Sequence, residues 1–381
     1  MRLALLTNFI PPYRAPLFRE LERRCSDFRI FLSATTEAGR AWKPDWGQLP
    51  VELQQSISSK WTWRHPSQFS ERMTMHFPYD TIPQLMRFRP DVIFTGEMGF
   101  RTLQASLYHR LFPESALVIW AKVTDATESG RGRLRHWLRA SLLNTTNAVV
   151  VNGENGANYI SRYGFPRERV FPVPATTEIQ PFLALPVTRV PEVRHRLVYS
   201  GMLTERKNLL ALLTQLSVWT KRNPSRTVDF DLLGDGPLRG QIATFKGPPN
   251  LRIRLLGSVT YDQLPKVYSE GGILAFPTLA DEWGMVVTEA MASGVPVLGS
   301  RYSQAVEELV KDGQNGWTFC PDDPEDFYGA LDRALQTPDH ELNQMAVLAR
   351  AAVSGITPAS VAERLLRVFE YARSTNSPRA D

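Results

Sequence analysis

Short apolar runs alternate with segments of helical periodicity through most of the chain, and this alternation constrains the fold more than any other feature. In the N-terminal half the apolar runs are MRLALLTN, DVIFTG, ALVIWAK and NAVVVNG. The segments with apolar positions at helical spacing are APLFRELERR, LRHWLRASLL and ENGANYISRYG. Strands that are apolar throughout are typical of a parallel sheet with helices on its faces. We therefore expect an α/β fold.

The alternation begins again after a proline-rich stretch. We interpret PATTEIQPFLALPVTRVPEVRHR, around residues 175–195, as an interdomain linker because it has no clear periodicity. Beyond it come the apolar runs RLVYSG, DFDLLGDG, IRLLGS, GILAFPT and VPVLGS, separated by helical segments such as LLALLTQLSVWTKR. A chain of 381 residues also exceeds the usual size of one hydrophobic core. We expect two doubly wound Rossmann-like domains, 1–185 and 186–355, facing across a cleft, and a helix at 356–381 that packs back on the first domain.

The composition narrows the class of protein. The chain is 43% hydrophobic and 22% charged, with a formal net charge of +5. This balance is typical of a globular protein and favours anionic partners such as phosphates or a membrane face, without indicating nucleic acid. No apolar run reaches the roughly 20 residues needed to span a bilayer, and the N-terminus lacks the pattern of a secretory signal. We expect a cytoplasmic protein, peripheral at the inner face of the membrane at most, with Cys25 and Cys320 as free thiols.

Two acidic residues flank a glycine in the segment PTLADEWGMVVTEAMASGVPVLGS. Asp281 follows the apolar run AFPT, Gly284 is expected where the loop enters a helix, and Glu289 lies about one turn further on. The first turn of this helix offers unpaired backbone N–H groups to an anion. The spacing fits equally well a loop cap at Asp281 and a solvated helix face at Glu289.

This segment, with AVEELVKDGQNGWTF after it, resembles the donor-binding region of GT-B glycosyltransferases of the retaining family-four group, the glycosyl transferases group 1. In that family seven residues separate an acidic residue from a glutamate. Here the pair is Asp281 and Glu289, with an aspartate in place of the usual first glutamate. The resemblance implies that Glu289 binds the ribose hydroxyls of a nucleotide and that Asp281 faces the transferred sugar. The neighbouring Glu282 is the alternative to Asp281.

Three further segments of the second half resemble the same family. VYSGMLTERKNLLALLTQL is similar to its glycine-rich turn between a strand and a helix, where a basic pair binds the donor diphosphate. Lys207 and Arg206 occupy the basic positions, whereas Met202 stands where an arginine is expected after the glycine. The alternative is that both cations are solvated charges in a first helical turn, where they oppose the helix dipole. LLGDGP and LLGSVTYDQL are similar to segments whose backbone comes close to the nucleotide.

The N-terminal half resembles the family through NFIPPYRAPLFREL, which is similar to a loop that closes over the acceptor. The resemblance implies that Pro12, Tyr13 and Arg14 line the acceptor site. The alternative is that the prolines only end the strand and Arg14 points to solvent. Many members have a histidine after the fourth N-terminal strand, but this chain has VIWAKVTDATESG there, in which Asp125 is our candidate acceptor-binding residue.

A basic segment, ESGRGRLRHWLRASLL, has arginines and leucines that recur at helical spacing. Arg131, Arg135 and Arg139 are predicted on one helix face and the leucines on another. A basic amphipathic helix of this kind binds anionic lipid or a lipid-linked phosphate. A surface helix with a solvated charged face has the same pattern, so both interpretations stay open.

The resemblance implies retaining, metal-independent transfer of a sugar from a UDP- or GDP-linked donor to an acceptor, without a cofactor. We expect a lipid-linked acceptor, in bacterial surface polysaccharide, glycolipid or glycoconjugate synthesis. The alternatives are a nucleotide-sugar epimerase of the same architecture and a non-catalytic subunit with a degraded donor site. The expected catalytic residues are Lys207, Arg206, Asp281 and Glu289. The expected donor-binding residues are Gly201, Gly234, Gly236, Ser258, Val259, Glu282, Trp283, Gly284, Met285, Val286 and Glu289.

Overall fold

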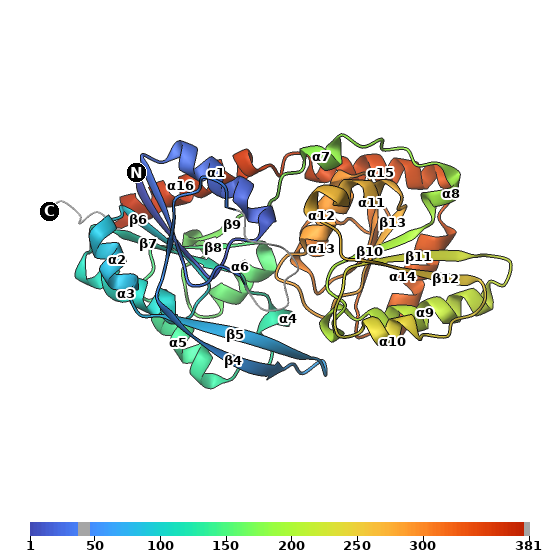
Figure 1. The fold of residues 1–381 in the computed structure, drawn as a ribbon, viewed down its shortest axis with the longest axis horizontal. Helices are drawn as coiled ribbons and strands as arrows, with labels where there is room; N and C mark the ends of the chain where they lie inside the picture. The colour runs from blue at the N-terminus through green and yellow to red at the C-terminus, as the bar shows by residue number, and fades with distance from the viewer. Residues whose placement is uncertain (37–45, 377–381) are drawn as a thin grey trace. The chain divides into compact units, whose positions relative to one another are not determined.

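The structure, a computed structural model, describes residues 1–36 and 46–376. The chain divides into two compact units (Figure 1). Unit 1 comprises Met1–Thr177 and Thr357–Asp381, and unit 2 comprises Glu178–Ile356. The predicted α/β fold class is confirmed, because each unit is built on a parallel sheet with helices.

Unit 1 contains a seven-stranded parallel sheet in the order β3-β2-β1-β6-β7-β8-β9. The chain first adds strands on one side of β1 and then continues on the other side at β6, so the strand order reverses between these two strands. Strands β6, β7 and β8 are buried along their whole lengths, which agrees with their apolar sequences. The strands are β1 (Arg2–Thr7), β2 (Asp27–Leu32), β3 (Val51–Leu53), β6 (Val92–Gly96), β7 (Ala116–Ala121), β8 (Ala148–Val151) and β9 (Val170–Pro172).

Helices pack against the sheet of unit 1, and the last of them comes from the end of the chain. Phe369 of this helix contacts Phe94 of β6, with ring centroids 5.0 Å apart. An antiparallel hairpin of β4 (Ser56–Arg64) and β5 (Ser70–Pro78) is an addition that the sequence pattern did not predict. The helices are η1 (Pro12–Arg14), α1 (Ala15–Arg24), α2 (Thr81–Phe88), α3 (Phe100–Leu111), α4 (Asp125–Glu128), α5 (Arg133–Leu143), α6 (Glu154–Ser161), η2 (Arg167–Arg169) and α16 (Pro358–Asn376).

Unit 2 contains a six-stranded parallel sheet in the order β12-β11-β10-β13-β14-β15. Numbered within the unit this is the order 3-2-1-4-5-6 of Rossmann folds, with its reversal between β10 and β13. The strands are β10 (Leu197–Ser200), β11 (Val228–Leu233), β12 (Leu251–Gly257), β13 (Ile273–Phe276), β14 (Val297–Ser300) and β15 (Gly316–Phe319).

The helices of unit 2 cover this sheet through apolar faces. Leu209, Leu212, Leu213 and Leu216 recur at helical spacing on one helix and are fully buried in the core of the unit. The helices are α7 (Gln180–Leu183), α8 (Pro191–Arg194), η3 (Glu205–Lys207), α9 (Leu209–Arg222), α10 (Arg239–Ala243), η4 (Tyr261–Gln263), α11 (Leu264–Ser269), α12 (Met285–Ala292), α13 (Gln304–Leu309), α14 (Pro324–Gln336) and α15 (Asp339–Val353).

The proline-rich stretch is packed onto unit 2. Phe182 is buried there, and its ring lies 5.9 Å from that of Tyr268. Arg189 is also buried, and its Nη2 donates a hydrogen bond of 2.6 Å to the carbonyl of Ser293. The observed division at Thr177 and Glu178 therefore differs from the boundary predicted at 185 and 186. The prolines begin the short helices α7 and α8, so the missing periodicity reflects short elements.

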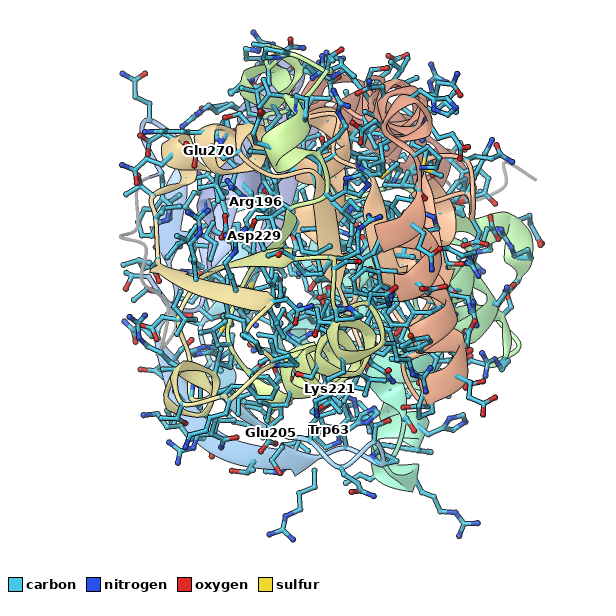
Figure 2. The ribbon with its side chains drawn as sticks, turned by 90° about the vertical axis from the view of Figure 1, so that its right-hand side faces the viewer. Trp63, Arg196, Glu205, Lys221, Asp229 and Glu270 are labelled. Atoms are coloured by element: carbon cyan, nitrogen blue, oxygen red, sulfur yellow. The ribbon has the colours of Figure 1, made fainter. Side chains whose placement is uncertain are left out.

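A contact at the amino ends of the unit 2 strands involves no predicted site residue. Arg196, directly before β10, donates from Nη1 to the carbonyl of Glu270 over 3.4 Å (Figure 2). Glu270 ends α11, which returns the chain to the amino end of β13. Residues at this edge of the sheet lie far from the carboxyl ends of the strands. They can therefore serve as control positions for mutations at the carboxyl ends.

Among the described residues, one stretch has the length and apolar composition of a membrane span. It covers Asp339–Asn376, and 44% of its most apolar window is buried. The stretch consists of α15 and α16, which are interrupted at residues 354–357 and belong to different units. Core helices of globular proteins pass the same test, so this finding is weak evidence for a span.

Candidate functional site

The loops after β10 and β13 lie side by side where the strand order of unit 2 reverses. Ligands of open α/β sheets bind at such a reversal, beyond the carboxyl ends of the strands. Helix η3 follows β10 and carries Arg206 and Lys207, while residues 277–284 lead from β13 into α12. The N–H of Leu279 donates to the carbonyl of Arg206 over 2.8 Å. The two loops are thus joined through their backbones.

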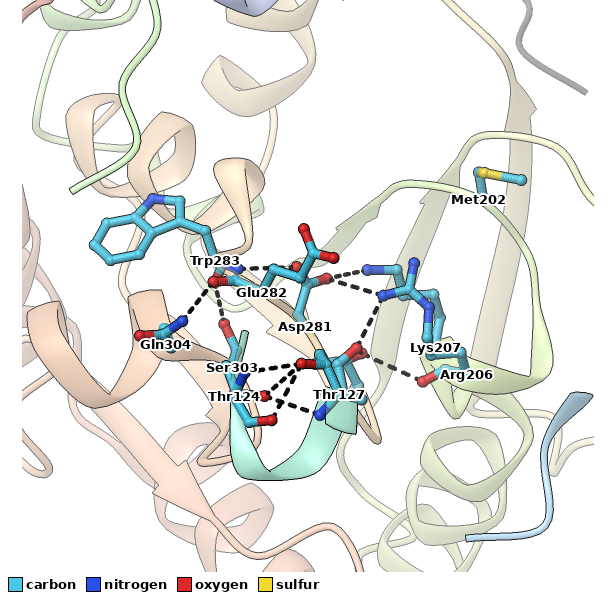
Figure 3. Close-up of polar contacts among 12 residues, drawn as sticks. Thr124, Thr127, Met202, Arg206, Lys207, Asp281, Glu282, Trp283, Ser303 and Gln304 are labelled. Atoms are coloured by element: carbon cyan, nitrogen blue, oxygen red, sulfur yellow. Dashed lines mark hydrogen bonds and ion pairs between the residues drawn. The ribbon is translucent and has the colours of Figure 1, made fainter. Parts of the chain in front are cut away.

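Asp281 contacts both predicted cations (Figure 3). Its Oδ2 forms an ion pair with Nζ of Lys207 and lies 3.8 Å from Nη1 of Arg206. Burial raises the pKa of Asp281, but Lys207 and Arg206 more than offset this and hold it below its ordinary value. All three side chains are largely buried, so the alternative of solvated cations is wrong. The carboxylate is ionised and serves as the counterion of the basic pair.

The loop that carries Asp281 is fixed by the turn after β14. Ser303 Oγ donates to the carbonyl of Trp283 over 2.5 Å, and Gln304 Nε2 donates to the carbonyl of Glu282 over 2.9 Å. Both donors are fully buried. Sequence reasoning missed them, although their place a few residues after the apolar run VPVLGS was a usable signal. Glu282 itself is exposed.

Gly284 allows this loop to enter α12. Its φ of 102° is a backbone conformation that residues with a side chain rarely adopt. A Cβ at this position would lie 2.9 Å from both the Phe276 ring and Ser303 Oγ. Met285 and Val286 form the first turn of α12, whose backbone N–H groups have no intrahelical acceptors. Such a turn can bind an anion. The buried indole of Trp283 supports it by donating to Thr288 Oγ1 over 3.2 Å.

Glu289 lies on the inner face of α12 and is only 3% exposed. Tyr268 Oη donates to its Oε2 over 3.3 Å. Burial raises the pKa of Glu289 to about 7, against the opposing hydrogen bonds from Tyr261 and Tyr268. The alternative of a solvated helix face is therefore wrong. The carboxyl group is poised near neutrality, and additional hydroxyl donors would favour its ionised form.

The glycines at the ends of β10 and β11 are required by the packing of the two strands. Gly234 has a φ of 130°, and a Cβ there would lie 1.9 Å from the carbonyl oxygen of Gly201. Its N–H donates to the carbonyl of Gly257, the last residue of β12, over 2.8 Å. Close backbone approach explains this glycine whether or not a ligand is bound. The predicted residues at the ends of these strands are Gly201, Gly234, Gly236, Ser258 and Val259.

The predicted acceptor residues of unit 1 lie in two places. Pro12, Tyr13 and Arg14 form η1 directly after β1, and the guanidinium of Arg14 lies 4.9 Å from the ring of Trp120. Arg14 is half-buried, so the alternative of a solvated side chain is wrong. Asp125 begins α4, and its exposed carboxylate forms an ion pair with Arg162.

A cluster of charged residues at the reversal point of unit 1 was missed by sequence reasoning. Glu97 follows β6 with a φ of 71°, which is unusual for a side chain of this size. Asn8 Nδ2, after β1, lies 3.0 Å from each carboxylate oxygen of Glu97, and Arg101 Nη1 donates to Asn8 Oδ1 over 2.9 Å. Desolvation raises the pKa of Glu97. The nearby cations Lys122, Arg101 and Arg14 outweigh desolvation, so the pKa lies below its ordinary value. The signal was a charged residue directly after the strand VIFTG.

The predicted basic face of α5 is turned inward, which corrects the sequence interpretation. Arg139 is buried, forms an ion pair with Glu128 and donates to Tyr159 Oη over 2.8 Å. Arg135 Nη2 lies 3.5 Å from Glu128 Oε1. Arg131 precedes the helix, and its guanidinium lies 3.3 Å from the ring centroid of Trp63. The buried carboxylate of Glu128 draws the arginines inward, so they form no solvated basic face.

Comparison with known proteins adds to these observations. Residues 194–337 match the family model for Glycosyl transferases group 1. A similar curated protein is D-inositol 3-phosphate glycosyltransferase of Corynebacterium diphtheriae, 29% identical over 181 residues, which are 45% of this chain and 42% of that protein. Sulfoquinovosyl transferase SQD2 of Arabidopsis thaliana is 30% identical over 32% of this chain and 23% of its own length. The chain thus spans less than half of the length of these relatives.

Solved structures extend the likeness to nearly the whole chain. The structure of Anabaena Alr3699/HepE in complex with UDP covers 97% of this chain and 100% of its own, with a TM-score of 0.72 and 16% identity. At this identity the likeness shows the fold, which is the two-domain GT-B fold. The chain therefore has the fold of GT-B glycosyltransferases. Lys207, Asp281 and Glu289 all lie within the residues that match the family model for Glycosyl transferases group 1.

Proposed function

We propose that this protein transfers a sugar from a UDP- or GDP-linked donor to an acceptor, with retention at the anomeric carbon. The observation that carries the proposal is the cluster of Asp281, Lys207 and Arg206 at the reversal point of the unit 2 sheet. Two findings support a nucleotide donor: the family match covers this cluster, and the similar Anabaena protein was solved with UDP.

Unit 2 binds the donor and stabilises its leaving group in this proposal. Lys207, Arg206 and the first turn of α12 offset the negative charge that grows on the diphosphate as the glycosidic bond breaks. These groups supply the positive charge without a metal ion or cofactor. Glu289 accepts hydrogen bonds from the ribose hydroxyls. Asp281 holds the two cations in place, and the exposed Glu282 is the better candidate for contact with the transferred sugar.

Unit 1 binds the acceptor. Its reversal point between β1 and β6 brings η1, with Pro12, Tyr13 and Arg14, to the same sheet edge as Glu97. A carboxylate held by Asn8 can accept hydrogen bonds from acceptor hydroxyls. We place the reaction in the cytoplasm, in the synthesis of bacterial surface polysaccharide, glycolipid or another glycoconjugate, with a lipid-linked acceptor. Asp125 has a weaker claim to acceptor binding because it is already paired with Arg162.

A donor panel tests the proposal. A UDP- or GDP-linked sugar should raise the thermal midpoint of the protein, because a ligand at a hundredfold excess over its dissociation constant stabilises by about 2.7 kcal/mol. The shift should persist when a chelator is added. Release of the nucleotide diphosphate is then assayed with the sugars that bind. A panel without any shift, or a shift that depends on Mg²⁺, contradicts the proposed site.

A non-catalytic subunit is the second candidate, and a specific observation favours it. Met202 is 37% exposed at the position where the resemblance predicts an arginine, so the site has one cation fewer than expected. This candidate predicts donor binding without turnover, and Met202→Arg would then be expected to restore it. A nucleotide-sugar epimerase predicts instead that the sugar changes without any acceptor. Product analysis with and without acceptor separates these two candidates from the transferase.

A further inference from the structure

Large apolar side chains are exposed on four neighbouring elements of unit 1. Helix α5 presents Leu134 and Trp137, which are 80% and 67% exposed, and strand β4 presents Ile57, which is 66% exposed. Soluble proteins rarely expose many such side chains together unless the surface binds something. The full set, called the apolar face below, is Ile57, Trp61, Met75, Phe100, Leu103, Leu107, Leu111, Leu134 and Trp137.

The elements that carry the apolar face are packed against one another. Phe77 of β5 contacts Phe100 of α3, with ring centroids 5.6 Å apart. Arg131, directly before α5, donates to Met73 of β5 over 3.1 Å and covers the ring of Trp63 in β4. Helices α3 and α5 also contact each other. Figure 1 shows the hairpin, α3 and α5 as neighbours within unit 1. The exposed side chains therefore lie on elements that pack against one another.

The orientation of α5 is specific. Its arginine side is turned inward, since Arg139 and Arg135 both contact the carboxylate of Glu128. Leu134 and Trp137 are turned outward as a consequence. Burying a guanidinium while exposing an indole and a leucine is the reverse of an ordinary surface helix. The helix thus leaves apolar surface in contact with water that another surface can cover.

The charge on the elements that carry the apolar face is mostly positive. The sequences of α3, α5 and β4 contain no acidic residue, and Glu71 is the only one in β5. Exposed cations adjoin the apolar side chains of the two helices, with Arg133 next to Leu134 and Arg110 next to Leu111. The hairpin cations Lys60, Arg64 and Arg72 point to the opposite face of the hairpin from Ile57, Trp61 and Met75. A surface with apolar and aromatic side chains among cations fits the interface of an anionic bilayer. A second copy of the same surface would bring like charges together.

We propose that the apolar face docks on the surface of an anionic lipid bilayer. Leu134, Trp137 and the side chains of α3 enter the boundary between headgroups and acyl chains, and the cations contact the lipid phosphates. Trp61 and Trp137 suit this position because an indole has an apolar body and a polar N–H. This inference goes beyond the proposed transfer reaction, because docking needs neither donor nor acceptor.

Vesicle binding tests the docking surface. The full chain is sedimented with vesicles of equal parts phosphatidylglycerol and phosphatidylcholine, and separately with pure phosphatidylcholine. The wild type should bind the anionic vesicles more tightly, and the double variant Leu134→Ser/Trp137→Ser should bind them about tenfold more weakly, since two largely exposed apolar side chains no longer enter the interface. Val347→Ser/Leu348→Ser is the matched control, because these residues of α15 are 57% and 49% exposed. It should bind like wild type.

Two further measurements test the role of the cations and the oligomeric state. Arg110→Gln/Arg133→Gln should weaken binding to the anionic vesicles, and added salt should weaken the wild type in the same way. All three double variants should keep the thermal midpoint of the wild type, because the replaced side chains are exposed. Equal vesicle binding by wild type and Leu134→Ser/Trp137→Ser overturns the proposal. So does a wild-type dimer in light scattering that this variant abolishes, since the face would then be an interface between copies.

Discussion

At the scale of single residues, Glu289 is the most informative side chain because its ionisation is coupled to its surroundings. Its pKa is raised to about 7 from an ordinary value of 4.5. The folded protein therefore holds this proton more tightly than the unfolded chain does, and stability falls as the pH rises from 4.5 to 7. One unit of pKa corresponds to 1.36 kcal/mol, so the whole loss is about 3 kcal/mol.

Glu289→Gln should remove this pH dependence. We expect the variant to gain stability relative to wild type as the pH rises through that window, measured as the urea midpoint of unit 2. It should also bind nucleotide diphosphate about ten- to a hundredfold more weakly, because a charge-assisted hydrogen bond to ribose is lost. Wild type should release a proton on binding near neutral pH, seen by calorimetry in buffers of different ionisation enthalpy. Glu270→Gln, at the opposite edge of the sheet, is the control.

Two outcomes would contradict this assignment of Glu289. If the Gln variant binds nucleotide like wild type, the carboxylate does not contact the ribose. If the stability difference between wild type and variant is independent of pH, the carboxyl group is not held near neutrality in the folded state. The resemblance to the family predicted Glu289 as a donor residue. It could not predict the pKa, because Tyr261 and Tyr268 come from elements earlier in the chain.

At the scale of elements, the ion pair of Asp281 with Lys207 links η3 to the loop after β13. Asp281→Asn should leave two largely buried cations uncompensated. Breaking one side of a buried pair costs about 3 to 5 kcal/mol. A bound diphosphate brings negative charge to the same cations, so nucleotide diphosphate should raise the thermal midpoint of Asp281→Asn more than that of wild type. Turnover should fall, because the cations are no longer held in place.

The control for this prediction is Glu282→Gln. Glu282 is exposed, so its replacement should leave stability unchanged and impair sugar transfer, with nucleotide diphosphate bound as before. A stable Asp281→Asn variant with normal turnover would show that the pair does not organise the two loops. Lys207→Ala should weaken nucleotide binding and reduce turnover further, because it removes the charge that stabilises the leaving group.

Elements that are buried on both faces were predictable, and exposed ones were not. Apolar runs such as ALVIWA predicted β7 because a central parallel strand is buried throughout. Strand β4, SISSKWTWR, is exposed at most positions and gave no alternating pattern. The orientation of α5 was predicted wrongly because its partner, Glu128, lies before the helix and no periodicity within the helix contains it. Glu97 was missed because a single charged residue after a strand does not form a pattern with other residues in the sequence.

At the scale of the whole molecule, the last helix of the chain belongs to unit 1, although the residues of unit 2 separate it from the rest of that unit. Leu365 and Phe369 of α16 are almost fully buried, and Phe369 contacts Phe94. Burying a side chain of this size contributes about 1.5 to 3 kcal/mol. Unit 1 therefore depends on residues that follow unit 2 in the sequence, whereas every predicted donor residue lies in unit 2.

Ending the chain after Ile356 should show whether unit 1 needs α16 and whether unit 2 binds nucleotide without it. We expect amides of β6 and β7 to lose protection from hydrogen exchange, because the helix that packs on them is absent. Amides of β10 and β13 should stay protected, and nucleotide diphosphate should bind with the affinity of the full chain. A chain ended after Asn376 keeps all of α16 and is the control. Unchanged protection of β6 would contradict the role of α16 in unit 1. Loss of nucleotide binding, with β10 and β13 still protected, would show that unit 2 alone does not form the donor site.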